Sequence, residues 1–512
     1  MGNMSMNNDR VDELLNIKMS KLKDGGQILK KNVNLVFEAL SKLDIEKYKD
    51  KYLCLSCIYG AFLGDSIGSC CEFLSQSPKN HEKIFTNGHL FKPGEVTDDS
   101  EMAISAAFGY IDSLTNDHSR IQDYLYYYFG IWRYSGPKDI GHATNEALID
   151  FTGDDISTIK FDPTRVNQVN KTSLANGALM RISTAIAYFY YFNLTRIKTI
   201  IIKFFSEDKI VELNNNMCQL YNDIFNELSL NVRITHPNFE NAISCSVFTL
   251  MVYVGMVTKD AKKVYNLFDI ISKSTNFVNS HPESLKKMAK AVQQKYLQII
   301  AEIKTNNIKS VYSHMGYYIH GFKLSVYFLH KYPDMGENKD TDLYYKIMCN
   351  VCDYGGDTDT NCAIVGTMIG PLIGYKNFKT DLFERFIKFI PDMRCQYTSA
   401  FMYVYVNYLE NKLLNDETKK KIEEIISKGK TETPMDIEEK KEEIKNEDGK
   451  MDIIKNENQK EDDNKNTINN NNQEENNPVE KKQGENKNEI KEENTPEGNN
   501  KPVENKPEEN NK

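Results

Sequence analysis

Apolar side chains recur at helical spacing through most of the first 415 residues of the chain. In the five clearest stretches, which are 10 to 17 residues long, apolar positions return every three to four residues, as on one face of an α-helix. They are DYLYYYFGIW (123–132), LMRISTAIAYFYYF (179–192), NAISCSVFTLMVYVGMV (241–257), YIHGFKLSVYFLHKY (318–332) and TSAFMYVYVNYLENKL (398–413). No series of short alternating runs with Asn-Gly or Asp-Gly turns accompanies them. The pattern predicts one compact, multi-helix, all-α domain from about residue 28 to about residue 415.

Composition divides the chain sharply near Leu414. Beyond it the sequence consists mainly of Lys, Glu, Asn and Asp with scattered Pro, and it contains no Phe, Trp or Tyr. Such a segment cannot bury enough apolar surface to offset the entropy cost of ordering it. We therefore predict a mostly disordered tail over 416–512, with a short helical start at 416–430, and a flexible N-terminus over 1–27.

Charge and hydropathy restrict the partners of the chain. The formal net charge of −9 arises from 64 basic and 73 acidic residues, both dense in the tail, which argues against a nucleic-acid partner because such proteins present a concentrated basic face. The best candidate for a membrane span, residues 362–375, is too short and contains Pro371. Without a signal-peptide pattern, we expect a soluble cytoplasmic protein that does not bind membranes, with a nuclear location left open. The tail is a candidate tether for an unknown protein.

The cysteines leave two readings open. Cys54 with Cys57, and Cys349 with Cys352, form two CxxC pairs that together have the composition of a four-cysteine zinc site. Both pairs lie in apolar segments of helical pattern, where residues three apart share a face and Cys behaves as a small hydrophobic residue. We favour the second reading, because neither pair has the Gly-rich knuckle of a zinc ribbon.

Two adjacent carboxylates in VTDDSEMAI (96–104) also have two explanations. Asp98 and Glu101 match a capping box, in which Asp98 would accept hydrogen bonds from the first free N–H groups of a helix. Alternatively, Asp98 and Asp99, beside the hydroxyl group of Thr97, offer oxygen ligands to a cation. This stretch alone favours the cap, because capping motifs are far more common than ion sites.

A second acidic stretch, GGDTDTNCAIVGTMIGPLIGY (355–375), favours the cation site. Asp357 and Asp359 alternate with hydroxyl residues before an apolar helix, so both carboxylates can face one side. The stretch is not an EF-hand, because Cys362 and Met368 occupy the positions where that loop requires Gly and Glu. An all-oxygen ligand set suits Mg²⁺ or Mn²⁺, whereas Zn²⁺ would recruit His or Cys.

The helix predicted after this stretch carries Gly366, Gly370 and Gly374 at four-residue spacing. Residues at this spacing lie on one face of a helix. Because small residues let two backbones approach closely, we expect another helix to pack against this face.

The stretch GAFLGDSIGSCCEF (60–73) contains GDSIG, which matches the G-x-S-x-G elbow of serine hydrolases. That elbow follows a strand of an α/β sheet, whereas the residues before GDSIG have a helical pattern and no βαβ alternation occurs elsewhere. A serine hydrolase acting through Ser66 is therefore a distant alternative. Asp65 is better suited to fixing a loop as a hydrogen-bond acceptor, and Glu72 to reaching a cation from a mobile loop.

Together these motifs resemble those of the ADP-ribosylglycohydrolase family, which includes the dinitrogenase reductase-activating glycohydrolase and the ADP-ribosyl-acceptor hydrolases. They run in family order over roughly residues 50–375. The motifs are GDSIGSCCEF (64–73), VTDDSEMAI (96–104), SGPKDIG (135–141), NGALMR (176–181), TH (235–236) and GGDTDTNCAIVGTMIG (355–370). The TDDS and GDTDT pair is the most specific. The resemblance implies an all-helical domain with a binuclear magnesium site.

The resemblance also implies which side chains hold the two Mg²⁺ ions, for which Mn²⁺ can substitute. They are Thr97, Asp98, Asp99, Asp357, Asp359, Thr360 and Glu72. Glu72, Asp99 and Asp357 are the candidate catalytic residues, and the sequence does not divide the roles of acid and base among them. Ser100 replaces the Thr that is more usual in the family and keeps its hydroxyl group.

The loop KTSLANGALMR (171–181) resembles the family segment that holds the diphosphate and the adjoining ribose. A Gly-bearing loop that opens a helix can direct backbone N–H groups at phosphate. Arg181 has two readings that the sequence does not separate, a phosphate clamp and a buried structural ion-pair partner. Asn145 stands where many relatives carry Arg, next to the retained Thr144. The candidate substrate-binding residues are Ser173, Asn176, Gly177 and His236.

The implied activity is hydrolysis of the bond between the anomeric carbon of ADP-ribose and a protein side chain. The expected partners are therefore ADP-ribosylated proteins or ADP-ribose conjugates. VTDDSEMAI and SCCEF slightly favour arginine linkage, whereas G-D-x-x-G-S-x-x-E also resembles the serine-linkage branch. A catalytically silent ADP-ribose-binding or structural relative is the second reading. Acidic pairs are often lost in such relatives, and here they are intact.

Overall fold

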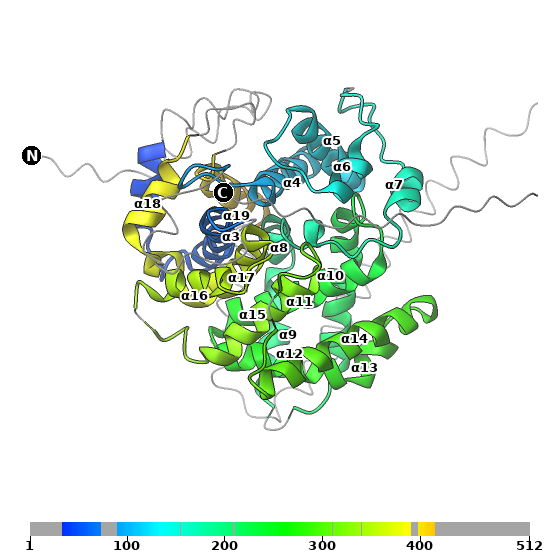
Figure 1. Cartoon of the computed structure of the whole chain (residues 1–512), viewed down its shortest axis with the longest axis vertical. Coiled ribbons are helices and arrows are strands. Elements are labelled where there is room, and N and C mark those ends of the chain that lie inside the picture. Colours follow the sequence, from blue (N-terminus) through cyan, green and yellow to red (C-terminus); the bar gives the residue numbers. More distant parts are fainter. Residues whose placement is uncertain are drawn as a thin grey trace, which may run out of the picture. The chain divides into compact units, whose positions relative to one another are not determined.

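A computed structural model describes residues 33–72, 90–153, 155–207, 210–309, 311–338, 340–390 and 398–414. Figure 1 shows these residues as helices joined by loops. Within these ranges there is no strand, and the only β-type pairing is an isolated bridge between Ala175 and Tyr317. The all-α prediction is confirmed. The predicted N-terminal segment 1–27 and tail 416–512 lie outside the described residues, so their assignments stay predictions.

The helices cover most of the described sequence. Residues 33–42 are helical. The α-helices that follow are α3 (Lys49–Gly68), α4 (Asp98–Thr115), α5 (Ile121–Tyr134), α6 (His142–Leu148), α7 (Pro163–Val169), α8 (Ser183–Phe192), α9 (Leu194–Phe204), α10 (Asn215–Val232), α11 (Phe239–Thr258), α12 (Ala261–Lys273), α13 (Thr275–Asn279), α14 (Glu283–Lys304), α15 (Ile319–Lys331), α16 (Leu343–Cys352), α17 (Thr358–Ile373), α18 (Thr380–Lys388) and α19 (Phe401–Leu413). Three short 3₁₀ helices are η3 (His118–Arg120), η4 (Asn176–Ala178) and η5 (Tyr375–Asn377).

Four of the five apolar stretches coincide with α5, α11, α15 and α19 to within three residues at each end. The fifth, 179–192, becomes an α-helix only at Ser183, because residues 176–182 form η4 and turns. The non-helical residues before Ser183 belong to the loop that was predicted to bind phosphate.

Helices α3 and α17 pack with their backbones in direct contact. The shared faces carry glycine at four-residue spacing, with Gly60, Gly64 and Gly68 in α3 and Gly366 and Gly370 in α17. A Cβ atom on Gly60 would lie 2.9 Å from the Cα atom of Gly370, and one on Gly68 would lie 2.6 Å from the Cα atom of Asp359. Because only glycine permits this approach, the contact fixes the first turn of α17 beside the last turn of α3.

Pro371 modifies α17 near its C-terminal end. Proline has no N–H, so the carbonyl oxygen of Thr367 lacks its helical donor, and the Cys57 thiol of α3 donates to it instead at 3.6 Å. Gly374 does not continue the glycine face as predicted. With φ of 83° it lies past the last helical residue, and a Cβ atom there would overlap the Tyr52 hydroxyl group.

The described cysteines are buried and form no disulfide bond. In the part of the chain that the structure describes, only carboxylate residues form groups of three or more side chains able to hold a metal ion. The structure therefore supports the reading of the two CxxC pairs as small hydrophobic residues and gives no support to the zinc reading.

Helix α11 corrects an expectation about membrane spans. It has 20 residues and a mean hydropathy of 1.5, so by length and composition it could cross a membrane. The sequence pattern placed only 241–257 in this helix and missed the residues at both ends. Its most apolar window is 89% buried inside the structure, as in a core helix, and no other helix among the described residues passes the same test.

Candidate functional site

The acidic start of α4 is capped differently from the prediction. Thr97 is the N-cap residue, and its hydroxyl group accepts a hydrogen bond from the Asp99 N–H at 3.4 Å. Asp98 is the first helical residue. The Glu101 carboxylate accepts from the indole N–H of Trp132 at 2.7 Å. The predicted capping box between Asp98 and Glu101 is therefore wrong, because Thr97 caps the helix and the Glu101 carboxylate binds Trp132.

Asp65 of α3 accepts further hydrogen bonds from this turn. The Thr97 N–H lies 3.1 Å from each Asp65 carboxylate oxygen. The Ser100 N–H and hydroxyl group donate to Asp65 Oδ2 at 3.2 and 2.5 Å. Burial raises the pKa of Asp65 to about 6, and these hydrogen bonds act in the opposite direction. As predicted, Asp65 serves as a hydrogen-bond acceptor for the loop.

The first turn of α17 contacts both of these elements. Asp357 is its N-cap residue. The Thr358 hydroxyl group donates to the Gly68 carbonyl oxygen at 2.8 Å, and the Thr360 hydroxyl group donates to Asp99 Oδ2 at 3.1 Å across a sequence separation of 261 residues. The end of α3, the start of α4 and the start of α17 therefore meet at one point.

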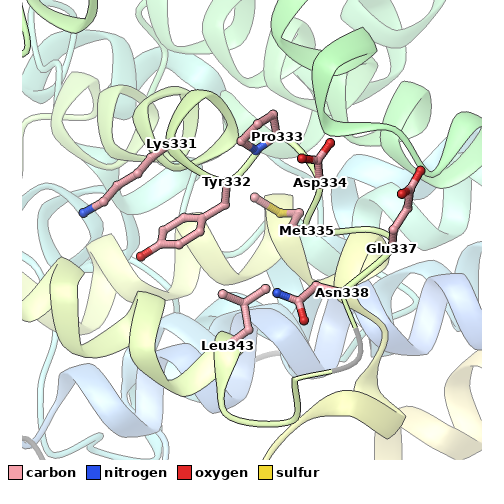
Figure 2. Close-up of a pocket in the computed structure, with 8 residues that line it drawn as sticks. All are labelled: Lys331, Tyr332, Pro333, Asp334, Met335, Glu337, Asn338 and Leu343. Atoms are coloured by element: carbon pink, nitrogen blue, oxygen red, sulfur yellow. The ribbon is translucent and has the colours of Figure 1, made fainter.

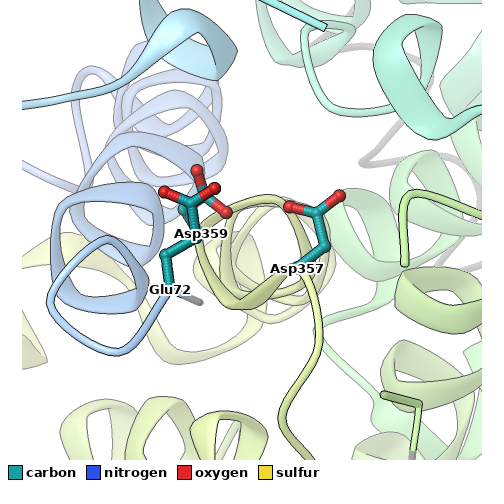
Figure 3. A group of neighbouring side chains, drawn as sticks. All are labelled: Glu72, Asp357 and Asp359. Atoms are coloured by element: carbon teal, nitrogen blue, oxygen red, sulfur yellow. The ribbon is translucent and has the colours of Figure 1, made fainter. Parts of the chain in front are cut away.

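Five carboxylates at this point form two overlapping groups. Within each group, one oxygen atom per residue lies within 4.8 Å of the others. The groups are Glu72, Asp357 and Asp359, and Asp98, Asp99 and Asp359. Figure 3 shows the first group, with the Glu72 and Asp359 carboxylates close together and Asp357 beside them at the start of α17. Asp359 belongs to both groups, so a pair of cations could share it.

Burial and mutual repulsion raise the pKa values of these carboxyl groups. The pKa values of Asp98, Asp99 and Asp359 lie well above their usual value, first because of burial and then because of neighbouring carboxylates. The pKa of Glu72 is raised to about 9, by burial first and Asp357 second. One oxygen atom each of Asp99 and Asp359 is buried without a hydrogen-bond partner. Divalent cations that prefer oxygen ligands would offset this repulsion and satisfy these atoms.

The loop 171–181 joins the acidic groups through Asn176. Its side-chain amide donates to Asp357 Oδ2 at 2.7 Å, and its backbone N–H donates to the Gly316 carbonyl oxygen at 2.8 Å. Ser173 is half-buried, and its carbonyl oxygen accepts a hydrogen bond from the Asn241 amide at 3.1 Å. The loop is therefore held against α17, α11 and the segment before α15.

Gly177 lies directly against the His236 ring. A Cβ atom on Gly177 would lie 2.8 Å from His236 Cε1 and 3.2 Å from the Thr144 hydroxyl group. His236 Nδ1 lies 2.8 Å from the Thr235 hydroxyl group, and its buried Nε2 has no hydrogen-bond partner in the structure. Burial, followed by the charge of Arg181, lowers the pKa of His236 to about 3, so the imidazole is neutral near pH 7.

Arg181 holds the loop in place through buried hydrogen bonds. Its side chain is wholly buried, and it donates to the Gly177 carbonyl oxygen at 2.7 Å and to the side-chain and backbone oxygen atoms of Asn231 at 3.3 and 3.2 Å. The guanidinium group also lies 4.5 Å from the centroid of the Phe129 ring. Among the described residues no carboxylate pairs with it. Arg181 is therefore neither a phosphate clamp nor an ion-pair partner but a buried donor to oxygen atoms of Gly177 and Asn231.

Ser66 lies in the last turn of α3. It is buried, the residues that lead up to it are those of the helix α3, and its hydroxyl group has no hydrogen-bond partner. A nucleophile elbow places its serine on a tight turn between a strand and a helix. The structure therefore gives no support to the serine hydrolase reading.

Two features near the site were missed in the sequence. Asp139 is partly exposed, and its charge raises the pKa values of Glu72 and Asp98. Gly316, with φ of 80°, brings its backbone against Asn176 and Asp357, since a Cβ atom there would lie 3.8 Å from a side-chain oxygen of each. The Gly-Pro turn before Asp139 marks a loop, but no local signal shows what that loop faces.

A separate cleft of about 420 Å³ lies beyond the C-terminal end of α15 (Figure 2). It is lined by Lys331, Tyr332, Pro333, Asp334, Met335, Glu337, Asn338 and Leu343. None of the predicted site residues lines it, so the cleft is distinct from the acidic groups.

Comparisons with known proteins match most of the described chain to one family. The family model described as ADP-ribosylglycohydrolase matches residues 45–395. A putative ADP-ribosyl glycohydrolase of Acanthamoeba polyphaga mimivirus is 24% identical over 329 residues, which cover 62% of this chain and 85% of the relative. An ADP-ribosyl-[dinitrogen reductase] glycohydrolase of Rhodospirillum rubrum is 26% identical over 133 residues, covering 25% of this chain and 41% of that protein. A solved structure titled ADP-ribosylglycohydrolase-related protein complex is 15% identical with a TM-score of 0.43, over 71% of this chain and 99% of that one.

Proposed function

Because the chain belongs to the ADP-ribosylglycohydrolase family, we propose that it is a magnesium-dependent enzyme that removes ADP-ribose from modified protein side chains. The family match supports the glycohydrolase activity. The observation that carries the metal dependence is the pair of carboxylate groups that share Asp359.

Two Mg²⁺ ions, or Mn²⁺ in their place, fit this donor set. All donors are oxygen atoms, which is the preference of hard divalent cations, and two of these atoms are buried without a partner. The proposed ligands are Thr97, Asp98, Asp99, Asp357, Asp359, Thr360 and Glu72. When bound, such ions supply a template for the ribose hydroxyl groups and Lewis-acid activation of water.

Cleavage at the anomeric carbon requires proton transfer on both faces of the ribose. The transition state resembles an oxocarbenium ion, with water entering on one face and a protonated leaving group departing from the other. Glu72, Asp99 and Asp357 are the proposed proton carriers.

The loop 171–181 is the proposed binding site of the diphosphate and adjoining ribose. The backbone N–H groups of Gly177 and Ala178 lie in the short helical turn η4, and the hydrogen bond from Arg181 to the Gly177 carbonyl oxygen polarises the Ala178 N–H towards an anion. His236 contributes a neutral ring nitrogen without a partner. Ser173 lies at the exposed edge of the same loop.

Arginine linkage is slightly favoured over serine linkage. Asp139 places a partly exposed negative charge near Glu72 and Asp98, where a guanidinium leaving group would be stabilised. The relative from Rhodospirillum rubrum is named for action on ADP-ribosyl-[dinitrogen reductase]. Its alignment with this chain covers less than half of either protein. A serine hydroxyl leaving group would gain nothing from Asp139.

A catalytically silent ADP-ribose-binding protein is the alternative. It is less well supported, because a protein that only binds ADP-ribose has no need of five mutually repelling carboxylates. Such a protein would bind ADP-ribose in chelator as it does in Mg²⁺.

The direct experiment is release of ADP-ribose from arginine-linked and serine-linked peptides. EDTA should abolish release, and added Mg²⁺ or Mn²⁺ should restore it. Full activity in chelator would refute the metal dependence. Release from neither peptide in Mg²⁺, with retained ADP-ribose binding, would favour the silent relative.

A further inference from the structure

The hydrogen bonds from α4 to Asp65 are unusual because they join the first turn of one helix to a side chain in the last turn of another. Free N–H groups at a helix start are commonly satisfied by a side chain at the N-cap position. Here the hydroxyl group of the N-cap residue Thr97 accepts a hydrogen bond from only one of these groups, the Asp99 N–H. The Ser100 N–H, the Ser100 hydroxyl group and the Thr97 N–H all donate to Asp65, which is completely buried.

This arrangement changes what the carboxylates of α4 can do. An aspartate that caps its own helix turns its oxygen atoms towards backbone N–H groups. Because Asp65 accepts the Ser100 N–H, neither Asp98 nor Asp99 is needed for that role. Their oxygen atoms instead face Asp359, within 4.8 Å.

We propose that Asp65 is a positioning residue that fixes the acidic start of α4 for cation binding. It acts through Thr97 and Ser100. This inference rests on the proposed function, since it presupposes that the carboxylates of α4 bind a divalent cation.

Asp65 lies in the part of α3 that contacts both α4 and α17, the two helices that carry the aspartates of the site. One turn later in α3, Gly68 is pressed against Asp359 and accepts a hydrogen bond from the Thr358 hydroxyl group at 2.8 Å. One helix therefore holds α17 through backbone contact and α4 through a carboxylate. A shift of α4 relative to α3 would separate Asp98 and Asp99 from Asp359.

A purely electrostatic contribution makes a different prediction. The charge of Asp65 also reaches Asp98 and Asp99, so its removal alone would weaken attraction for a cation. If only charge matters, Asp65→Asn and Asp65→Ala should have equal effects. If position matters, Asn should retain part of the affinity, because its carbonyl oxygen can still accept from Ser100.

The test is calorimetric titration of the full chain with Mn²⁺, together with the melting temperature of each metal-free variant. We expect Asp65→Ala to weaken Mn²⁺ binding by about tenfold or more, the usual effect of losing a residue that orients metal ligands, and Asp65→Asn by about threefold. Ser105→Ala is the matched control, since its hydroxyl group bonds only within α4 to the Glu101 carbonyl oxygen. It should bind Mn²⁺ as the parent does.

Each outcome separates the inference from the proposed function. Parent protein that binds no Mn²⁺ would refute both. Normal Mn²⁺ affinity in Asp65→Ala with a lowered melting temperature would overturn the inference alone and leave Asp65 a structural cap. Equal losses in the Asn and Ala variants would assign the effect to charge. If Asp65→Ala does not fold, Ser100→Ala replaces it, and an unchanged Mn²⁺ affinity there would count against the inference.

Discussion

The acidic groups and the loop 171–181, which form the two sides of the candidate site, differ in how their buried charges are compensated. On the acidic side, five carboxylates face one another, and among the described residues no basic side chain pairs with them. On the side of the loop 171–181, Arg181 is buried without a carboxylate, but its guanidinium group donates to three oxygen atoms of the protein. The buried charge on the loop side is thus satisfied by the protein itself, whereas the charges on the acidic side are not.

This difference indicates where stability and function separate. A buried donor whose partners are all present contributes to the fold, and its loss leaves those partners unsatisfied. Carboxylates that repel one another destabilise the fold, so they are expected to be kept for what they bind. Substitutions on the acidic side should therefore impair activity at little cost in stability, and substitutions on the loop side should alter the shape of the site.

The largest effect is expected on the acidic side. Asp98→Asn and Asp359→Asn should each lower kcat/KM by at least about 10²-fold, a loss of ~2.7 kcal/mol in transition-state stabilisation, because either change removes a charged ligand. The metal-free melting temperature should hold or rise as repulsion is relieved. Asp112→Asn, farther along α4 and bonded to the Tyr128 hydroxyl group, is the control. Near-normal turnover in either site variant would show that the carboxylates are structural.

A smaller effect is expected on the loop side. Gly177→Ala would place a methyl group 2.8 Å from the His236 ring, so the loop must shift away from it. We expect KM for an ADP-ribosylated peptide to rise by about tenfold, equivalent to ~1.4 kcal/mol, with less change in kcat. Gly141→Ala is a matched glycine control, because a Cβ atom there meets nothing within 4 Å. Equal kinetics for the two variants would argue against substrate contact at Gly177.

At the rim, the effect should depend on the substrate. Asp139→Asn should lower kcat/KM for arginine-linked peptide by about threefold to fivefold and leave serine-linked peptide unchanged, because only the guanidinium carries a positive charge, and an exposed pair is worth up to about 1 kcal/mol. Steady-state assays of both peptides at two salt concentrations measure this. Loss on both substrates would assign Asp139 to the metal centre.

No effect is expected inside α3. Ser66→Ala should retain kcat/KM within about twofold, because the buried hydroxyl group has no hydrogen-bond partner to lose. A fluorophosphonate probe should not label the parent protein. Labelling that disappears in Ser66→Ala would support the serine hydrolase hypothesis and contradict the proposed site.

The sequence predicted the parts of this site whose signals are local. Apolar spacing predicted the helices, and the alternation of Asp with hydroxyl residues predicted the acidic turns at Asp98 and Asp357. Prediction from local sequence failed where a residue far away in the sequence changes the hydrogen bonds of a motif. Asp98 and Glu101 match a capping box, but Asp65, 35 residues before Ser100, accepts the Ser100 N–H instead. Likewise, nothing near Arg181 in sequence shows that Asn231 will accept its hydrogen bonds.

The wide separation of the acidic turns also has a consequence for biosynthesis. At the usual rates of translation, the 261 residues between Asp99 and Thr360 take roughly 13 to 52 s to add. During that interval α3, which is buried along almost its whole length in the finished protein, has no α17 to cover its glycine face. The newly made N-terminal part is therefore expected to depend on chaperones or on temporary contacts on the ribosome, and to gain its affinity for divalent cations only in the final steps of folding.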